Sequence, residues 1–352
     1  MQYKLLGKSG LRVSELCLGT MTFGEEWGWG GSRDASREMF EAFGNAGGNF
    51  LDTANVYTEG SSERIVGELV AAEREHWVVA TKYSVHMGPE MNAGGNHRKS
   101  IVQSLDASLK RLGLEYIDLY WVHAWDFTTP AEEVMRALDD MVRAGKVLHV
   151  GVSDTPAWVV SRANTFAELR GWSSFVGLQI EYSLVERTPE RDLLPMALEL
   201  GLTVTPWSPL GQGVLTGKYS DGSESGNGRL DDPNRGPRFL TERNLVIADA
   251  VGDVAKAIGR SPSQVAIRWL LQRPLSCIPI IGGRTVEQIA DNMKCLEFEL
   301  DDAAMQKLDE VSAVELGFPH SFFLGPTVRD FAFRGTLDKL ENPKDPKHYQ
   351  SL

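Results

Sequence analysis

The sequence predicts a closed barrel of eight parallel strands and eight helices, a (β/α)8 or TIM barrel. Two features of the 352-residue chain carry this prediction. Short, almost wholly apolar runs alternate with segments of helical period, as in parallel sheets covered by helices. Eight such runs can be counted, and eight strand–helix units in one chain favour a closed barrel. We expect residues 1–352 to form one barrel domain, with residues 315–352 as an irregular tail.

The strands are expected in chain order after an N-terminal hairpin at residues 3–16, where a Gly-Lys-Ser-Gly turn separates two apolar segments. The runs that predict the barrel strands are Leu16–Gly19, Asn49–Asp52, Trp77–Thr81, Ile117–Val122, Val147–Val152, Phe175–Ile180, Thr203–Pro206 and Ser276–Ile280.

Helices are expected between these runs. Ser100–Leu112 and Glu132–Val142 each place apolar residues on one helical stripe, and Asp301–Val314 predicts a final helix. Thr285 is placed as an N-cap before another stripe. Glycines at positions suited to end helices are Gly47, Gly113, Gly145 and Gly201.

Three long segments interrupt the alternation: Phe23–Ser32, Tyr83–Arg98 and Gly211–Leu240. Each follows the end of an expected strand, and long loops inside compact domains are usually functional or disordered. On a barrel, loops after strands lie on the face that carries the active site.

The composition excludes several classes of function. A formal net charge of -12 argues against nucleic acid or an anionic membrane as the main partner. Three cysteines at unrelated spacings, Cys17, Cys277 and Cys295, form no disulfide or metal pattern and fit a reducing cytoplasm. The N-terminus resembles no signal peptide, and no apolar run is long enough to span a bilayer.

Ionisable residues end three consecutive strands. Asp52 ends the second strand, Lys82 follows the third, His123 follows the fourth, and Tyr57 lies in the loop after the second. Neighbouring parallel strands are about 5 Å apart, so these side chains could share one site. Taken singly, the lysine reads as a loop charge and the histidine as a structural residue. Their succession on neighbouring strands favours a site.

The chemistry of this set is coherent. An ammonium such as that of Lys82 stabilises a phenolate and lowers the pKa of a tyrosine, whose reference value is about 10. Asp52 would keep Lys82 charged and oriented, and His123 would donate a hydrogen bond to a substrate carbonyl. The set contains no hydride source, so carbonyl reduction would require a cofactor. His123 and Asp126 have no third ligand at suitable spacing, so no metal site is expected.

The motifs around these residues resemble those of the aldo-keto reductases, and most closely the branch of aryl-alcohol dehydrogenases related to potassium-channel β-subunits. The matching segments span nearly the whole chain. They are L-G-x-S-G-L-x-V-S at 6–14, L-G-T-M-T-F-G at 18–24, G-G-N-F-L-D-T-A-N-V-Y at 47–57, A-T-K-Y at 80–83, L-Y-W-V-H at 119–123, G-K-V-L-H-V-G-V-S-D at 145–154, Q-I-E-Y-S-L at 179–184 and P-W-S-P-L-G-Q-G-V-L-T-G-K at 206–218.

The resemblance implies that Asp52, Tyr57, Lys82 and His123 are a catalytic tetrad with Tyr57 as the proton donor. It also implies a (β/α)8 barrel that binds NADP(H), with NAD(H) less favoured, without a Rossmann motif. Glycines at 211, 213 and 217 superficially resemble a dinucleotide fingerprint, but the residues after them form a loop rather than a crossover helix.

Cofactor contacts follow from the same resemblance. Trp207 would stack on the nicotinamide, although a core tryptophan is the alternative, and Asp154 stands where many relatives have asparagine. NADP preference rests mainly on Arg284, because Gly282-Gly283 replaces a Lys-Ser pair that reads the 2′-phosphate in other branches. The implied contact residues are Gly19, Thr20, Met21, Ser153, Asp154, Gln179, Trp207, Ser208, Pro209, Leu210, Gly211, Gly213, Lys218, Arg229, Gly282, Arg284, Gln288 and Asn292.

Aromatic residues in the expected catalytic-face loops would line a substrate pocket: Trp27, Trp29, Trp125 and Phe322. Alternatively, some of them cover the edge of the core. The leading interpretation is an NADPH-dependent reductase of a small-molecule aldehyde or ketone. The alternative is a regulatory protein that binds NADPH as a redox signal with little turnover. The sequence selects neither a particular carbonyl substrate nor an oligomeric state.

Overall fold

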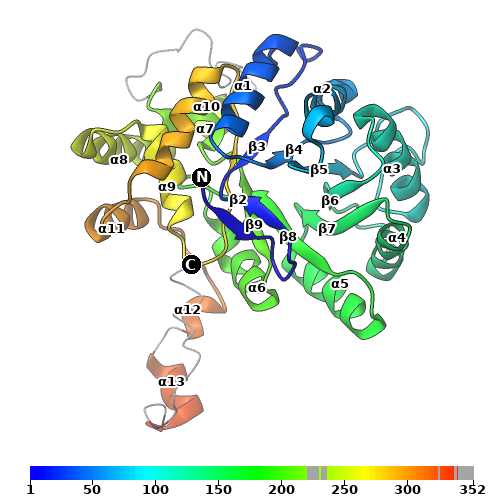
Figure 1. Cartoon of the computed structure of the whole chain (residues 1–352). Coiled ribbons are helices and arrows are strands. Elements are labelled where there is room, and N and C mark those ends of the chain that lie inside the picture. Colours follow the sequence, from blue (N-terminus) through cyan, green and yellow to red (C-terminus); the bar gives the residue numbers. More distant parts are fainter. Residues whose placement is uncertain (220–229, 231–235, 324–325, 337–338, 340–352) are drawn as a thin grey trace.

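The barrel prediction is confirmed. A computed structural model describes residues 1–219, 230, 236–323, 326–336 and 339. Its eight parallel strands are ringed by helices (Figure 1). The strands, in spatial order, are β10 (Ile280–Ile281), β3 (Cys17–Gly19), β4 (Phe50–Asp52), β5 (Val78–Tyr83), β6 (Ile117–Val122), β7 (Val147–Ser153), β8 (Phe175–Glu181) and β9 (Thr203–Trp207).

The barrel closes where the chain before β10 lies against β9. The Val204 amide donates to the Ser276 carbonyl at 2.8 Å, and the Ile278 amide donates to the Val204 carbonyl at 2.9 Å. The expected strand Ser276–Ile280 is therefore present only in part, with Cys277 as an isolated bridge. Pro279 explains the break, since proline has no N–H for the ladder, although its carbonyl accepts from Cys17 at 3.0 Å.

Helices follow the strands as expected. The long ones are α1 (Arg33–Asn45), α2 (Ser61–Val70), α3 (Arg98–Leu112), α4 (Ala131–Arg143), α5 (Ala157–Arg170), α6 (Leu193–Leu200), α8 (Glu242–Ile258), α9 (Pro262–Leu271), α10 (Val286–Met293) and α11 (Asp302–Val311). Short ones are η1 (Tyr57–Gly60), η2 (Ala71–Glu73), η3 (Thr188–Arg191), η4 (Gly211–Thr216), α7 (Gly236–Phe239) and η6 (Lys294–Glu297). No helix within the described ranges is both long and apolar enough to cross a membrane.

Helix ends show which local expectations were right. Gly113 and Gly201 are C-caps with positive φ, and Gly47 and Gly145 directly follow the C-caps of α1 and α4. Thr285 stands at the N-cap position of α10, but its side chain makes no capping hydrogen bond.

The tail expected to be irregular contains two short helices in its described part. They are α12 (His320–Phe323) and α13 (Pro326–Phe333), and both extend away from the barrel (Figure 1).

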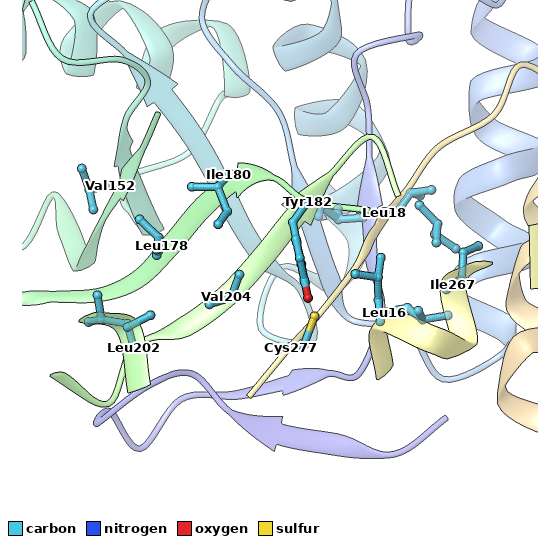
Figure 2. Packing of buried hydrophobic residues seen from close by; sticks show 14 of the residues in the cluster. Leu16, Leu18, Val152, Leu178, Ile180, Tyr182, Leu202, Val204, Ile267 and Cys277 are labelled. Atoms are coloured by element: carbon cyan, nitrogen blue, oxygen red, sulfur yellow. The ribbon is translucent and has the colours of Figure 1, made fainter. Parts of the chain in front are cut away.

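Two apolar layers hold the strands in place. Side chains pointing outward pack beneath the helices, and Figure 2 shows Leu16 and Leu18 beside Ile267 of α9. Side chains pointing inward fill the barrel in a separate cluster, which includes Phe50, Ala80 and Trp121. Successive residues of a strand alternate between these two layers.

The inner cluster is built around Trp121, which is fully buried. A Cβ atom on Gly151 would lie 2.3 Å from its ring, and one on Gly177 would lie 2.8 Å away. The two glycines therefore make room for the indole inside the barrel. The floor is closed by the hairpin of β1 (Tyr3–Leu5) and β2 (Arg12–Ser14), which contributes Leu6 and Val13 to the cluster.

Candidate active site

The period of the strands brings the ionisable residues together. Ala80 and Trp121 point into the barrel, so Lys82 and His123, two positions further along, lie on the same face at the top. Asp52 stands two positions after the inward-facing Phe50. The apolar barrel therefore ends in a polar layer at the carboxyl ends of β4, β5 and β6.

Lys82 is the centre of this layer and is fully buried. Its Nζ donates to Asp52 Oδ2 at 2.5 Å, to the Thr53 carbonyl at 2.9 Å and to the Tyr57 hydroxyl at 3.0 Å. An ammonium has three donors and no acceptor, so all three donors are used. The Tyr57 oxygen is therefore an acceptor toward Lys82, and its own proton is free to point at a substrate.

Tyr57 is held by an unusual turn. Thr58 and Glu59 have φ of 45° and 55°, a left-handed conformation that costs a non-glycine residue about 1–2 kcal/mol. Hydrogen bonds hold the turn, because the buried Thr58 Oγ1 donates to the Phe23 carbonyl at 2.6 Å and accepts from the Ser62 amide at 3.1 Å. The phenol is thus positioned by a rigid connection between β4 and α2.

Burial and charge set the protonation states. Burial acts to lower the pKa of Lys82, but the neighbouring Asp52 and Tyr57 outweigh it and the net pKa lies above the ordinary value. Burial raises the pKa of Tyr57, and the ammonium of Lys82 opposes the rise without cancelling it. Lys82 therefore acts in the predicted direction, but burial dominates and the net pKa of Tyr57 lies above its ordinary value.

His123 is neutral over the whole physiological range. Burial, assisted by the positive charge of Lys82, lowers the pKa of the imidazole to about 3. The ring meets Tyr57 edge-on, with ring centroids 5.9 Å apart. Within the described residues, its Nδ1 is buried without a hydrogen-bond partner. A buried N–H donor without an acceptor is costly, so Nδ1 is better left unprotonated and Nε2 carries the proton.

The residues expected to hold a nicotinamide amide lie next to this layer, at the ends of β7, β8 and β9. Gln179 Nε2 donates to Asp52 Oδ1 at 3.0 Å, which couples the two groups of residues. Trp207 Nε1 donates to Asp154 Oδ1 at 3.0 Å. Burial raises the pKa of Asp154, and the bond from Trp207 opposes that rise. Within the described ranges, the buried Ser153 Oγ has no partner.

The expected phosphate loop contains several backbone sites with positive φ. Ser208 has φ of 52°, and Gly211 and Gly213 have φ of 56° and 104°. Lys218 Nζ lies beside the Tyr219 ring, 4.9 Å from its centroid. Pro209 and Leu210 lie in the turn between β9 and η4, whereas Arg229 is outside the described residues.

The expected adenosine side lies around α10. Arg284 is exposed, and its amide donates to Gln288 Oε1 at 2.7 Å. Asn292 Nδ2 lies 3.4 Å from the Gly282 carbonyl. Gly19 ends β3, whose neighbour in the sheet is β10, and Thr20 and Met21 follow it. The Thr20 hydroxyl donates to the Asp52 carbonyl at 3.0 Å. The structure thus places all the described candidates on the same end of the barrel as the ionisable layer.

The structure gathers only some of the expected pocket aromatics. Trp27 lies over Tyr57 with ring centroids 6.4 Å apart, and Trp29 lies 5.4 Å from Trp27. Trp125 is half-buried and packs against the outer core. Phe322 does not join them: it lies on α12, is 56% exposed and contacts the rings of Phe318 and Phe323. The reason is that α12 leaves the barrel after α11 (Figure 1).

Glu181 belongs to the same face but escaped the sequence interpretation. It ends β8 opposite Trp207 in the parallel register. Burial and the nearby Glu186 raise the pKa of its carboxyl to about 7, although Arg238 acts in the opposite direction. The signal was available, because Glu181 stands two positions after the inward-facing Gln179.

A search of the described residues finds no cluster of three or more histidine, cysteine or acidic side chains that could hold a metal ion. All three cysteines are buried and unpaired.

Comparison with known proteins identifies a matching family and several similar proteins. Residues 15–313 match the model of the aldo/keto reductase family. The norsolorinic acid reductase of Aspergillus flavus is 39% identical, over 92% of this chain and 84% of its own length. The NADP(+) aryl-alcohol dehydrogenase of Phanerodontia chrysosporium is also 39% identical, over 89% of this chain and 86% of its own. A putative aryl-alcohol dehydrogenase of Saccharomyces cerevisiae is 36% identical, over 90% and 88%.

Proposed function

Because the chain belongs to the aldo/keto reductase family, we propose that it is an NADP(H)-dependent oxidoreductase that reduces an aldehyde or ketone to an alcohol. In this proposal Tyr57 donates the proton. The family and the reductase and dehydrogenase names of its relatives support an oxidoreductase acting on carbonyl groups. The NADP(+) in the name of the Phanerodontia relative favours the phosphorylated cofactor here.

One observation carries the proposal: the 3.0 Å hydrogen bond from Lys82 Nζ to the Tyr57 hydroxyl. With its other two donors taken by Asp52 and Thr53, the ammonium is fixed in place. It stabilises the negative charge that Tyr57 acquires on losing a proton. A tyrosine held in this way is a general acid for an oxygen that is becoming an alkoxide.

The residues present fit a nicotinamide dinucleotide. Ser153, Asp154 and Gln179 bring a hydroxyl, a carboxyl and an amide together at the ends of β7 and β8, so a carboxamide would meet both donors and acceptors. The Trp207 ring is tethered through its Nε1, which leaves the face of the ring for stacking. Arg284 stands next to the N-terminus of α10, where an anion is favoured.

The mechanism assigns one role to each residue. Ser153, Gln179 and Trp207 would hold the nicotinamide ring, which would supply the hydride for the carbonyl carbon. The neutral His123 donates from Nε2 to the carbonyl oxygen and orients it, and Tyr57 transfers its hydroxyl proton to that oxygen. Lys82 then stabilises the phenolate, and Asp52 keeps Lys82 in position. Trp27 and Trp29 would lie against the apolar body of the substrate.

The first test is the substitution Tyr57→Phe. It removes the proton donor and leaves the cofactor side of the site unchanged, so we expect kcat to fall by at least about 100-fold. NADPH affinity, measured by fluorescence titration, should change by less than about twofold. Near-normal turnover in this variant would rule out the mechanism.

A panel of carbonyl compounds tests the proposal as a whole. Steady-state NADPH and NADH oxidation would be measured with aryl aldehydes, methylglyoxal, keto-sugars and steroids. Turnover of about 1 per second or more with one class supports the enzyme. Turnover far below that, together with tight NADPH binding, would instead indicate a redox-sensing regulatory protein.

Cofactor preference is tested at Arg284. Paired guanidinium donors suit a phosphate, so Arg284→Ala should lower kcat/KM for NADPH by about 10-fold or more and leave that for NADH nearly unchanged. An unaltered NADPH/NADH ratio would show that another residue reads the phosphate.

A further inference from the structure

We propose that Asn96 and Asp126 are positioning residues: they form a clamp between two loops that sets His123 for the carbonyl substrate. The loops are residues 84–97 after β5 and residues 123–130 after β6. The inference rests on the proposed carbonyl reduction for its kinetic consequence, but the clamp itself is a matter of geometry.

The need for a clamp arises because the side chain of His123 is poorly anchored. Among the described residues, its buried Nδ1 has no partner, and the ring is in edge contact with Tyr57. A ring without side-chain hydrogen bonds takes its position from its backbone. The placement of the main chain at residue 123 therefore decides where Nε2 points.

That main chain is tied to the neighbouring loop at several points. The His123 amide donates to the Tyr83 carbonyl at 3.0 Å. Ser84 Oγ donates to the Ala124 carbonyl and accepts from the Ala124 amide, both at 3.1 Å. Asn96 Nδ2 donates to the same Ala124 carbonyl at 3.0 Å. Each of these bonds joins the segment after β5 to the residue next to His123 or to His123 itself.

Asn96 and Asp126 complete the connection on the other side of Trp125. The Asp126 amide donates to Asn96 Oδ1 at 2.6 Å, and the Asn96 amide donates to Asp126 Oδ2 at 2.7 Å. The side chain of Asn96 therefore bonds residue 124 with its nitrogen and residue 126 with its oxygen. Trp125 lies between these two anchored residues. Asn96 is fully buried, so water does not compete for these bonds.

Both carboxylate oxygens of Asp126 accept hydrogen bonds within the clamp. Its Oδ1 accepts from the amides of Thr128 and Thr129 at 2.8 Å each, and its Oδ2 also accepts from Thr129 Oγ1 at 2.8 Å. Burial acts to raise the pKa of Asp126, but these hydrogen bonds outweigh it and hold the pKa below the ordinary value. The carboxylate is therefore ionised and saturated, and it serves neither as an acid nor as a metal ligand.

The backbone around the clamp is held in costly conformations. Ser84 and Phe127 have φ of 92° and 57°. Non-glycine residues avoid this region, so each such position requires surrounding contacts that maintain it. Gly95 has φ of +88° and allows its loop to lie close to the carboxylate of Asp126, because a Cβ there would lie 3.1 Å from Asp126 Oδ2. Hydrogen bonds that maintain strained loops next to a site are expected to control its geometry.

The clamp lies on the carbonyl side of the site. It acts at the ends of β5 and β6, whereas the proposed nicotinamide and adenosine contacts stand at the ends of β7 to β10 and after β3. Loosening the clamp should therefore disturb carbonyl turnover without weakening NADPH binding. Misplacing His123 affects kcat for every substrate.

The test compares Asn96→Ala with Asn164→Ala. Asn164 is a matched control, because this buried asparagine likewise uses its side-chain oxygen and nitrogen on backbone groups: it accepts from the Phe175 amide at 2.9 Å and donates to the Phe175 carbonyl at 3.3 Å. Phe175 begins β8, at the opposite end of the barrel. Measurements are kcat and KM for a small and a bulky aldehyde, Kd for NADPH, and backbone hydrogen exchange.

We expect Asn96→Ala to lower kcat for both aldehydes by about 10–100-fold. Kd for NADPH should stay within about twofold, and exchange should rise in residues 84–97 and 123–129. Asn164→Ala should lose stability while both aldehydes keep their kcat/KM ratio. Parallel losses in carbonyl turnover and NADPH affinity, or no change in a folded variant, would overturn the inference.

A second variant and a measurement that does not depend on activity complete the test. If Asn96→Ala does not fold, Ser84→Gly removes both bonds to Ala124 and tolerates the positive φ, and the same outcomes apply to it. If the unmodified protein turns over no carbonyl, the proposed function fails and hydrogen exchange alone decides the clamp. Faster exchange confined to the two loops supports the clamp, and unchanged exchange refutes it.

Discussion

At the scale of single residues, the site depends on one fully used ammonium. Lys82 reaches a carboxylate, a carbonyl and a phenol with its three donors. This saturation explains why burial of a charge is tolerated here, since a buried ion is stable only when paired and hydrogen-bonded. It also determines the direction of the Tyr57 proton, because the phenol oxygen must accept from Lys82.

His123 leads to a prediction about acid sensitivity. Its pKa in the folded protein is about 3, against about 6.5 when unfolded. Between these two pH values the imidazole is protonated in the unfolded chain but not in the folded one. The contribution of His123 to the free energy of unfolding is therefore fully present above about pH 6.5 and is lost as the pH falls toward 3. Between pH 6.5 and 4.5 the loss from this group should be about 2 kcal/mol.

Comparison with His123→Asn isolates this contribution. Urea denaturation of both proteins at several pH values gives the free energy of unfolding of each as a function of pH. The unmodified protein should lose stability relative to His123→Asn as the pH falls from 6.5 to 4.5. The comparison matters because Glu181, with its raised pKa, contributes in the opposite sense over part of the same range. Curves of equal slope would show that the folded protein accommodates a charged imidazole.

At the scale of elements, the barrel interior is set by a contact between one large side chain and two glycines. Gly151→Ala would place a methyl group 2.3 Å from the Trp121 ring, which is buried and has no room to move. We expect a loss of about 1–3 kcal/mol in unfolding free energy, measured by chemical denaturation.

Gly252→Ala is the matched control for that substitution. Gly252 lies within α8, and a Cβ there would meet nothing within 4 Å. Alanine favours the helix over glycine, so this variant should gain up to about 1 kcal/mol. Similar effects at both positions would indicate that backbone preference, rather than the packing of Trp121, determines the outcome.

The strand pattern also explains which site residues could be predicted from the sequence. Asp52, Lys82 and His123 each follow an apolar residue by two positions, so strand period alone places them on one face. Glu181 likewise stands two positions after the inward-facing Gln179, but the sequence interpretation did not consider it.

Two features had no local signal in the sequence. The contact between Asn96 and Asp126 joins two separate loops, and no periodicity links their positions. Phe322 was assigned to the pocket because its segment was expected to be one of the loops on the catalytic face. The direction in which a chain leaves a helix depends on contacts that composition does not reveal.

At the scale of the whole molecule, a buried ionic cluster connects the loop after β8 with α9 and with the end of α11. Glu190 accepts from Arg187 Nε at 2.7 Å and from the Tyr182 hydroxyl at 2.8 Å. The Arg187 Nη1 continues to Ser312 Oγ at 2.8 Å. The Trp269 ring lies beneath the Arg187 guanidinium at 5.3 Å.

Glu190→Gln should therefore destabilise the fold by about 3 kcal/mol, because it removes the nearer carboxylate of the buried Arg187 and leaves only Asp309, at 3.4 Å. Glu297→Gln is the control, since Glu297 pairs with Arg260 at 2.8 Å in a more exposed position and should change stability by no more than about 1 kcal/mol. Both values come from denaturant midpoints. A loss of unfolding free energy at Glu190 as small as that at Glu297 would show that the buried cluster stabilises the fold no more than a surface ion pair does.

The seam between β10 and β3 has a consequence for how the protein is made. Cys17 and Ile280 pair directly, although they come from opposite ends of the barrel sequence. A ribosome releases the N-terminal part first, so Asp52, Tyr57, Lys82 and His123 emerge long before residues 276–281. Until that last segment emerges, β3 lacks its neighbour β10 and the barrel cannot close. The layer of Asp52, Lys82 and His123 thus gains its complete surroundings only near the end of translation.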